Sequence, residues 1–420
     1  MLNVTGASRL GRWFPALAEP DVRLYLGGQA LSMMGTWMLD ITLNLLVWQL
    51  SGSPLLLGVL NFVLYGPGVL VVPLFSGRLT AANARRCTLW VLAAALAVAL
   101  ALAVLTALDR LTIGLLFALA LARGVLNGME VPSRQMLLTS SIRSSERMAS
   151  AVALNTVVFQ LARMLGPALA GVVFATAGPL CAFSLTALGQ LCMIACVFRL
   201  RGAASPAAAP GAGAGRGGVR GAMDFVRADR FASLFLPVLV CMGLFAGSYQ
   251  TLVPVLADHV FGNTTRWTSA FFAAVGVGAV VVSVLLSTPQ IDRLISRCQV
   301  SVPWLAVLAL VGLGLSRWPL LSLASFVLLG ACMAFIATAT NAVMHQRVPP
   351  HARGGLIALF LMSFVGTIPL GQLLAGWLAQ WLSVQATFLL LAAGLGAALL
   401  LLFVPRWRAL GRLELDARRI

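Results

Sequence analysis

Four charged residues lie inside long apolar stretches of this sequence: Asp40, Arg123, Glu130 and Arg163. A charged group in the hydrocarbon region of a membrane is costly unless it pairs with another group or faces water. The two arginines lie near the middle of their stretches, whereas Glu130 comes at the end of its stretch, just before Pro132. Each of the four is therefore a candidate functional residue.

Two interpretations of these charges remain open. In the structural one, Asp40 pairs with Arg123, and Glu130 pairs with Arg134 or Arg163, so that the charges hold helices together. In the functional one, the carboxyl groups carry protons, because removal from water favours the protonated form of an acid. The arginines, which are always charged, would then hold an anionic substrate or keep a carboxylate deprotonated until the substrate displaces it.

Neutral polar and small residues in the apolar stretches complete the candidate site. Amide and phenol groups could bind substrate or link neighbouring helices, whereas glycine and proline allow close approach and bending. The neutral substrate-cavity candidates are Gln29, Asn44, Asn127, Tyr249, Gln250, Asn341 and Gln372. The gating and hinge candidates are Gly77, Arg78, Arg85, Arg86, Arg134, Gly166, Pro167, Gly171, Gly371 and Gly376.

The elements that position these residues must be membrane helices. The chain is 60% hydrophobic and only 10% charged, whereas about a quarter of the residues in a soluble protein are charged. A helix of about 20 apolar residues crosses the hydrocarbon core, and twelve such stretches predict an all-α membrane protein with twelve transmembrane helices. They run approximately over 24–50, 55–75, 89–108, 113–129, 151–175, 180–198, 231–256, 267–286, 302–315, 320–343, 355–381 and 386–403.

A repeat divides these helices into two halves. Gly166-Pro167-Ala168-Leu169-Ala170-Gly171 recurs as Gly371-Gln372-Leu373-Leu374-Ala375-Gly376, 205 positions later. Parallel repeats of this kind place a substrate site between the halves near the middle of the bilayer. We expect an N-terminal arm at 1–20, a six-helix half at 21–199, a linker rich in Ala, Gly, Pro and Arg at 200–230, a second half at 231–404 and a basic tail at 405–420.

The net charge of +17 comes from arginine alone, since all 29 basic residues are arginines. By position, 24 of the 29 fall in the N-terminal arm, the C-terminal tail and alternate loops, and only Arg110, Arg266 and Arg317 fall on the opposite side. An excess of arginine in cytoplasmic loops orients membrane proteins. The distribution predicts that both termini are cytoplasmic, and it explains the charge without a nucleic-acid partner.

Signatures of enzymes, cofactors and metals are not found in the sequence. It contains neither a Walker A sequence nor an HExxH motif, and its seven cysteines include no CxxC pair. These motifs carry nucleotide and metal chemistry. We therefore predict a protein that is not an enzyme, binds no cofactor or metal, and draws its energy from an ion gradient.

Several segments resemble the major facilitator superfamily, and within it the efflux branch that includes the enterobactin exporter and the transmembrane secretion effectors. The resemblance covers roughly 21–403, and the segment 161–171, Leu-Ala-Arg-Met-Leu-Gly-Pro-Ala-Leu-Ala-Gly, carries its most specific match. That segment is also similar to a Gly-Pro motif associated with exporters. Further matches are 24–29, 35–38, 50–54, 130–135 (Glu-Val-Pro-Ser-Arg-Gln) and 153–155.

The chain departs from the family pattern at two places. The loop between the second and third helices usually carries an acid that belongs to a cytoplasmic gate, and Ala81 stands in its place. Asn83 and the pair Asp292-Arg293 are other sources of gating contacts. Arg123 is followed by Leu126 and Asn127, where the family has Gln and Gly, so the resemblance leaves its role in proton coupling open.

The resemblance implies a secondary transporter of the bacterial inner membrane that exports a small organic molecule by proton antiport and alternating access. A siderophore is the expected substrate, with protons and the lipid bilayer as partners and a monomer as the expected state. In this interpretation Asp40, Glu130 and Arg123 couple protons, and Arg163 and Arg123 face the substrate. Alternatives are a multidrug, macrolide or lysophospholipid exporter and, in another class, a membrane receptor or scaffold that does not transport.

Overall fold

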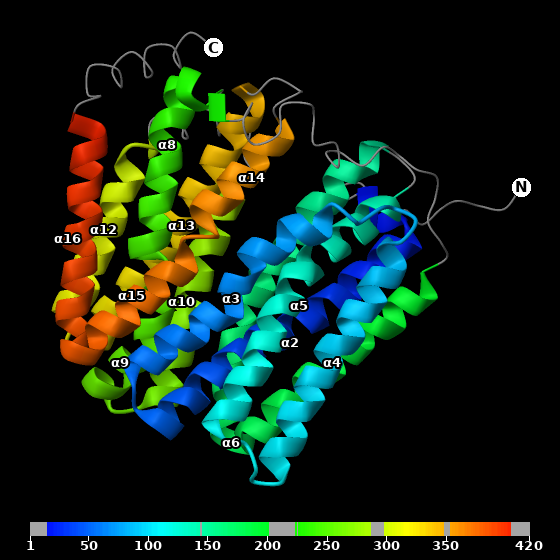
Figure 1. Ribbon diagram of the computed structural model, residues 1–420, viewed down its shortest axis with the longest axis horizontal. Coiled ribbons are helices and arrows are strands. Elements are labelled where there is room, and N and C mark those ends of the chain that lie inside the picture. The colour runs from blue at the N-terminus through cyan, green and yellow to red at the C-terminus, as the bar shows by residue number, and fades with distance from the viewer. Residues whose placement is uncertain are drawn as a thin grey trace, which may run out of the picture. The chain divides into compact units, whose positions relative to one another are not determined.

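The computed structural model describes residues 15–142, 145–200, 223–224, 226–286, 298–347 and 353–404, and every regular element within these ranges is a helix (Figure 1). Most are α-helices, η1 is a turn of 3₁₀-helix and η2 is a short π-helix. They are η1 (Pro15–Ala18), α2 (Pro20–Ser51), α3 (Pro54–Ser76), α4 (Ala84–Ala107), α5 (Ile113–Ser140), α6 (Ser145–Arg199), α8 (Arg230–Cys241), η2 (Met242–Ala246), α9 (Tyr249–Phe261), α10 (Thr264–Leu285), α12 (Ser301–Leu315), α13 (Pro319–Arg347), α14 (Arg353–Phe364), α15 (Ile368–Trp381) and α16 (Val384–Phe403).

Ten helical segments of the described chain are long and apolar enough to cross a bilayer. One of them, Ser150–Arg199, contains two arms, because Gly178 breaks the helical backbone with φ +75°. Glycine adopts this conformation readily since it has no Cβ. Counting both arms and adding the shorter apolar helix α12 gives twelve helices within the described residues, which confirms the predicted all-α membrane fold.

Contacts divide the chain into two compact units. Unit 1 comprises Met1–Thr42 and Leu70–Pro210, and unit 2 comprises Leu43–Val69 and Gly211–Ile420. The end of α2 and most of α3 belong to unit 2, where a Cβ added to Gly58 would lie 2.8 Å from the carbonyl oxygen of Gln372 in α15. The boundaries expected at 21–199 and 231–404 stay a prediction.

Unit 1 holds α2 tightly against the second arm of α6. A Cβ added to Gly35 would lie 3.1 Å from the Cα of Thr186, and one added to Gly189 would lie 2.8 Å from the carbonyl oxygen of Leu31. Membrane helices associate through such small residues because lipid provides no hydrophobic drive between them. The close packing fixes which face of α2 meets α5 and α6.

Unit 2 has a comparable close contact and an aromatic core. The helices α10 and α13 pack on each other with Gly330 directly against the carbonyl of Val275. The rings of Tyr249, Phe271 and Phe326 pack together where α9, α10 and α13 meet. The π-helix η2 interrupts the span that joins α8 to α9. These contacts hold the polar residues of α9 and α15 in place.

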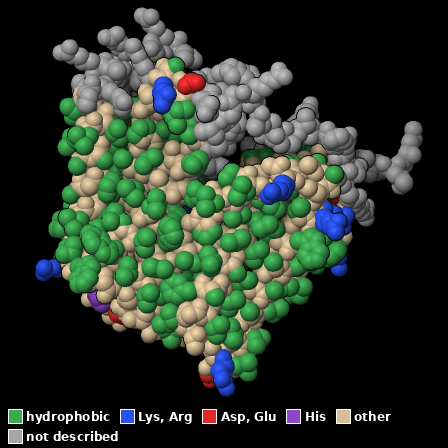
Figure 2. Space-filling view, in the orientation of Figure 1, with side chains coloured by type: hydrophobic (Ala, Val, Ile, Leu, Met, Phe, Trp, Pro, Cys, Tyr) green, Lys and Arg blue, Asp and Glu red, His purple; other side chains and the backbone are tan. Residues whose placement is uncertain are grey.

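The surface of the described helices is apolar, as a bilayer requires. Large side chains such as Leu320, Trp381 and Leu401 are more than three-quarters exposed, at 79%, 77% and 76%. Figure 2 shows apolar side chains over most of the visible face, with the charged side chains near its margins. Exposed apolar surface on this scale indicates contact with lipid rather than with water.

Candidate functional site

Three charged residues share one face of α5. Arg123, Glu130 and Arg134 are separated by seven and four residues, which correspond to about two turns and one turn of helix. All three are buried, at 3%, 1% and 2% exposure. The face is therefore directed into the interior of unit 1.

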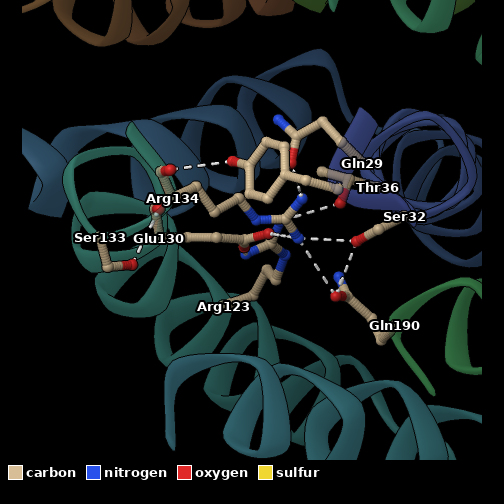
Figure 3. Close-up of polar contacts among 9 residues, drawn as sticks. Gln29, Ser32, Thr36, Arg123, Glu130, Ser133, Arg134 and Gln190 are labelled. Atoms are coloured by element: carbon tan, nitrogen blue, oxygen red, sulfur yellow. Dashed lines mark hydrogen bonds and ion pairs between the residues drawn. The ribbon is translucent and has the colours of Figure 1, made fainter. Parts of the chain in front are cut away.

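Glu130 joins the two arginines. Its Oε2 accepts a hydrogen bond from Arg123 Nη1 at 2.9 Å, and its Oε1 forms an ion pair with Arg134. Figure 3 shows the carboxylate of Glu130 between the two guanidinium groups. A single carboxylate thus compensates two arginines, an arrangement in which any change in its charge affects both.

Arg134 is also bound by neutral groups of α2 and α6. It donates to Gln29 Oε1 at 2.7 Å from Nη1, and to Ser32 Oγ at 2.6 Å from Nη2. Ser32 in turn donates to Gln190 Oε1 at 2.9 Å, which lies 3.4 Å from Arg134 Nη2. The hydroxyl of Tyr25 donates to the Arg134 carbonyl at 2.9 Å. The bonds to Gln29 and Ser32 hold the guanidinium group in place, and the Tyr25 bond holds the backbone of α5 (Figure 3).

The position of Arg134 corrects the sequence interpretation. The fourth apolar stretch was expected to end at Met129, with Arg134 in a polar cytoplasmic segment, but α5 continues to Ser140. Pro132 lies inside this helix. A proline ring disturbs the carbonyl four residues earlier, here that of Gly128, and membrane helices tolerate this where neighbouring groups satisfy the backbone. Arg134 is consequently the most highly connected residue of the site.

Sequence reasoning missed Tyr25, Ser32, Thr36 and Gln190. Thr36 accepts a long hydrogen bond, 3.4 Å, from Arg123 Nη2. A signal for the first three was present, since polar residues recur on α2 at 25, 29, 32, 36 and 40, the spacing of one helix face. Gln190 has no comparable pattern on α6.

Asp40 and Arg163 are two further candidates in unit 1. Asp40 is buried and follows Thr36 by one helical turn, on the same face of α2. Arg163 of α6 is half-buried, with its guanidinium carbon 5.7 Å from the centre of the Trp37 ring. Trp37 also packs edge-on against Phe159. Among the described residues, none accepts a hydrogen bond from the buried Trp37 Nε1.

The candidate residues of unit 2 form separate pairs. Gln372 donates to Gln250 Oε1 at 2.6 Å. Asn61 Nδ2 donates to Asn44 Oδ1 at 2.9 Å, and Asn61 is a partner that sequence reasoning did not identify. Tyr249 is buried against aromatic rings. Two further candidates, Asn341 on α13 and Asn127 on α5 of unit 1, are half-buried.

Four gating candidates lie where α3 passes into α4, with Gly77 and Arg78 in the turn and Arg85 and Arg86 in the first turn of α4. Gly77, Arg78 and Arg86 are exposed, whereas Arg85 is half-buried and donates to the Phe198 carbonyl at 2.9 Å. Asn83 stabilises this turn, because it accepts from the Thr80 N–H at 2.7 Å and donates to the Arg78 carbonyl at 2.9 Å. Asp292 and Arg293 lie outside the described residues. A gating role for the turn stays a prediction.

The hinge candidates lie at close helix contacts. A Cβ added to Gly166 would lie 2.6 Å from the Cβ of Trp37, and one added to Gly376 would lie 2.6 Å from the Pro54 carbonyl oxygen. Gly371 packs directly against the carbonyl of Leu244 in η2. Pro167 and Gly171 are buried in α6. Both copies of the repeated motif therefore mark helix contacts.

The described residues contain no cluster of His, Cys, Asp and Glu that could hold a metal ion. The chemistry of the site is instead that of buried guanidinium groups, one shared carboxylate and surrounding amides and hydroxyls. Groups of this kind can bind anions and exchange hydrogen bonds.

Comparison with known proteins identifies the family. The model of the transmembrane secretion effector family matches residues 16–419. The chain is 22% identical over 371 residues to the staphyloferrin A transporter of Staphylococcus aureus (strain NCTC 8325 / PS 47), covering 87% of this chain and 91% of that protein. It is 27% identical over 320 residues to the multidrug efflux pump Tap of Mycolicibacterium fortuitum, covering 74% and 76%.

The fold agrees with this assignment. The crystal structure of a bacterial homologue of the iron transporter ferroportin, in an inward-facing state, matches with a TM-score of 0.63 at 16% identity, covering 94% of this chain and 98% of that one. Identity this low shows the fold alone. Together with the family match over nearly the whole sequence, it establishes that this chain belongs to the transmembrane secretion effector family, whose members are membrane transporters of the major facilitator type and not enzymes.

Proposed function

We propose that this protein exports a small anionic organic molecule in exchange for protons, and that the Arg123–Glu130–Arg134 cluster of unit 1 binds both. The observation that carries the proposal is the shared carboxylate: Glu130 bridges two buried arginines. An anionic substrate would compete with the Glu130 carboxylate for the two guanidinium groups. Exchange requires that proton and substrate occupy the site in turn, so the cluster would release its proton to the cytoplasm before the substrate binds there.

Buried donors of unit 1 support an anionic substrate. Arg134 Nε and Trp37 Nε1 have no acceptor among the described residues. A buried donor without an acceptor is costly, and a ligand with several acceptor oxygens would remove that cost. A carboxylate-bearing chelator such as a siderophore has this chemistry, and similarity to the staphyloferrin A transporter supports the same class.

Asp40 is the second acid of the proposal. It lies one turn beyond Thr36, the Arg123 partner, and a buried acid so close to the cluster is placed to pass protons to or from Glu130. The arginine asymmetry of the loops supports both termini in the cytoplasm of a bacterial inner-membrane protein. We expect a monomer to carry out the complete cycle.

Export of apolar drugs is a second candidate. The Trp37–Phe159 pair, with Arg163 over the indole ring, offers an aromatic surface of the kind that stacks on planar molecules. Similarity to the multidrug efflux pump Tap favours the same class. The two candidates differ in the charge of the substrate, so transport assays separate them.

The test is flux of staphyloferrin A into vesicles that contain the purified protein, with and without a proton gradient. We expect gradient-driven flux in the wild type and its loss in a folded Asp40→Asn variant, since asparagine keeps the shape but cannot release a proton. Asp109→Asn, at an exposed acid in the turn after α4, is the matched control and should transport normally. Unchanged flux in Asp40→Asn would contradict proton coupling through this residue, and transport of ethidium but not of the chelator would favour the second candidate.

A further inference from the structure

An apolar groove on unit 2 is separate from the charged cluster. It lies between α8, α14 and α16 and has a volume of about 620 Å³. Its walls include Leu236 and Val240 of α8, Leu359 of α14 and Leu402 of α16. Apart from Arg227, Ser233 and Ser363, the described side chains that line the groove are apolar or cysteine, so its occupant should be largely hydrocarbon.

The length of the groove matches one leaflet of a bilayer. It follows α8 from Ser233 to Cys241, nine residues that span about 12 Å of helix. One leaflet contributes about 15 Å of the hydrocarbon core. The groove ends just before the π-helix η2, which begins at Met242. An extended acyl chain entering from the membrane surface would therefore reach Cys241 near mid-bilayer.

The charge at the other end selects the headgroup. Arg227 is exposed and lines the groove just before α8 begins. The neighbouring acid Asp229 accepts a 2.8 Å hydrogen bond from the Ala232 N–H and so caps α8, whereas Asp224 does not line the groove. A guanidinium group binds a phosphate with two parallel hydrogen bonds. Arg227 lies toward the linker, on the side predicted to be cytoplasmic, where anionic lipid attracts basic residues.

We propose that this groove binds one acyl chain of an anionic phospholipid, with the lipid phosphate against Arg227. The proposal does not depend on the transported substrate, because no groove residue belongs to the charged cluster of unit 1. It assigns a lipid to α8 beside the only π-helix of the described residues. Bound lipid would thus support the helix at its irregular turn.

The test is photocrosslinking of purified protein by phosphatidylglycerol that carries a diazirine near the end of one acyl chain. We expect crosslinks around Val240 and Cys241, and their loss in Val240→Trp, which fills the groove. Val284→Trp, at a lipid-exposed position of α10, is the matched control and should keep the crosslinks. Crosslinks spread evenly over α10 and α13, or crosslinks around Cys241 that persist in Val240→Trp, would overturn the proposal.

The headgroup is tested by competition and by native mass spectrometry. Unlabelled phosphatidylglycerol should compete about fivefold better than phosphatidylcholine, the ratio expected for one basic residue at a membrane surface. Arg227→Gln should abolish this preference, whereas Arg23→Gln, at an exposed arginine of α2, should not. Equal competition by both lipids in the wild type would refute the role of Arg227, and a dimer that Val240→Trp dissociates would show a second copy of the chain in the groove instead of lipid.

Discussion

Replacing Glu130 by glutamine tests the charged cluster most directly. The carboxylate pairs with Arg123 Nη1 at 2.9 Å and with Arg134, and the three side chains are between 2% and 4% exposed. Glutamine keeps the length of the side chain and one carbonyl oxygen but removes the charge. Two guanidinium groups would then remain buried without the carboxylate that joins them.

The expected loss of stability follows from this geometry. Removing one partner of a buried ion pair lowers stability by about 3–5 kcal/mol, and a hydrogen bond retained by the amide offsets about 1 kcal/mol of this loss. Arg134 also keeps its bonds to Gln29 and Ser32. We therefore expect Glu130→Gln to lower the free energy of unfolding by about 2–4 kcal/mol, or roughly 30- to 1000-fold in the ratio of folded to unfolded protein.

Denaturant unfolding of the purified protein in a mild detergent measures this change. The matched control is Glu19→Gln, which removes an acid from the 3.1 Å pair with the partly exposed Arg147 and should cost about 1 kcal/mol or less. The double variant Glu130→Gln/Arg123→Gln should lose less free energy of unfolding than the two single variants lose together. The reason is that removing both partners of a buried pair leaves fewer uncompensated charges. A Glu130→Gln protein as stable as the control would refute the reasoning.

Three further predictions concern packing, substrate binding and topology. Gly166→Ala places a Cβ 2.6 Å from that of Trp37, so it should lower the free energy of unfolding by about 1–3 kcal/mol and reduce flux. The control Gly27→Ala, whose added Cβ has nothing within 4 Å, should change neither stability nor flux. Equal behaviour of the two variants would contradict the close contact. Arg163→Lys keeps the charge but loses the planar stack on Trp37, so substrate affinity in the vesicle assay should fall about fivefold, and an unchanged affinity would remove Arg163 from the site. Reporter fusions at Gly262 and Arg220 should report opposite sides of the membrane, and a common side would disprove the predicted topology.

The candidate site was only partly predictable from sequence. Arg123, Glu130, Gln29 and Asp40 were identifiable because a charge or amide in an apolar stretch needs a partner or a function. Arg134 was placed outside the membrane helices, because the fourth apolar stretch was expected to end at Met129, although α5 continues to Ser140. Gln190 was missed because nothing in its neighbourhood on α6 shows that it faces Ser32.

The class of structure was predictable from the amino-acid sequence. Within a bilayer the backbone N–H and C=O groups must hydrogen-bond to one another, so the twelve apolar stretches were expected to form helices. The family match over residues 16–419 agrees with this expectation. Which polar groups contact one another depends on how the helices pack. Gln29 and Arg134 are 105 residues apart, and their contact depends on how α2 and α5 pack within unit 1. That packing is set by small residues such as Gly35 and Gly189, whose close approach to neighbouring backbone cannot be derived from the hydropathy of either helix.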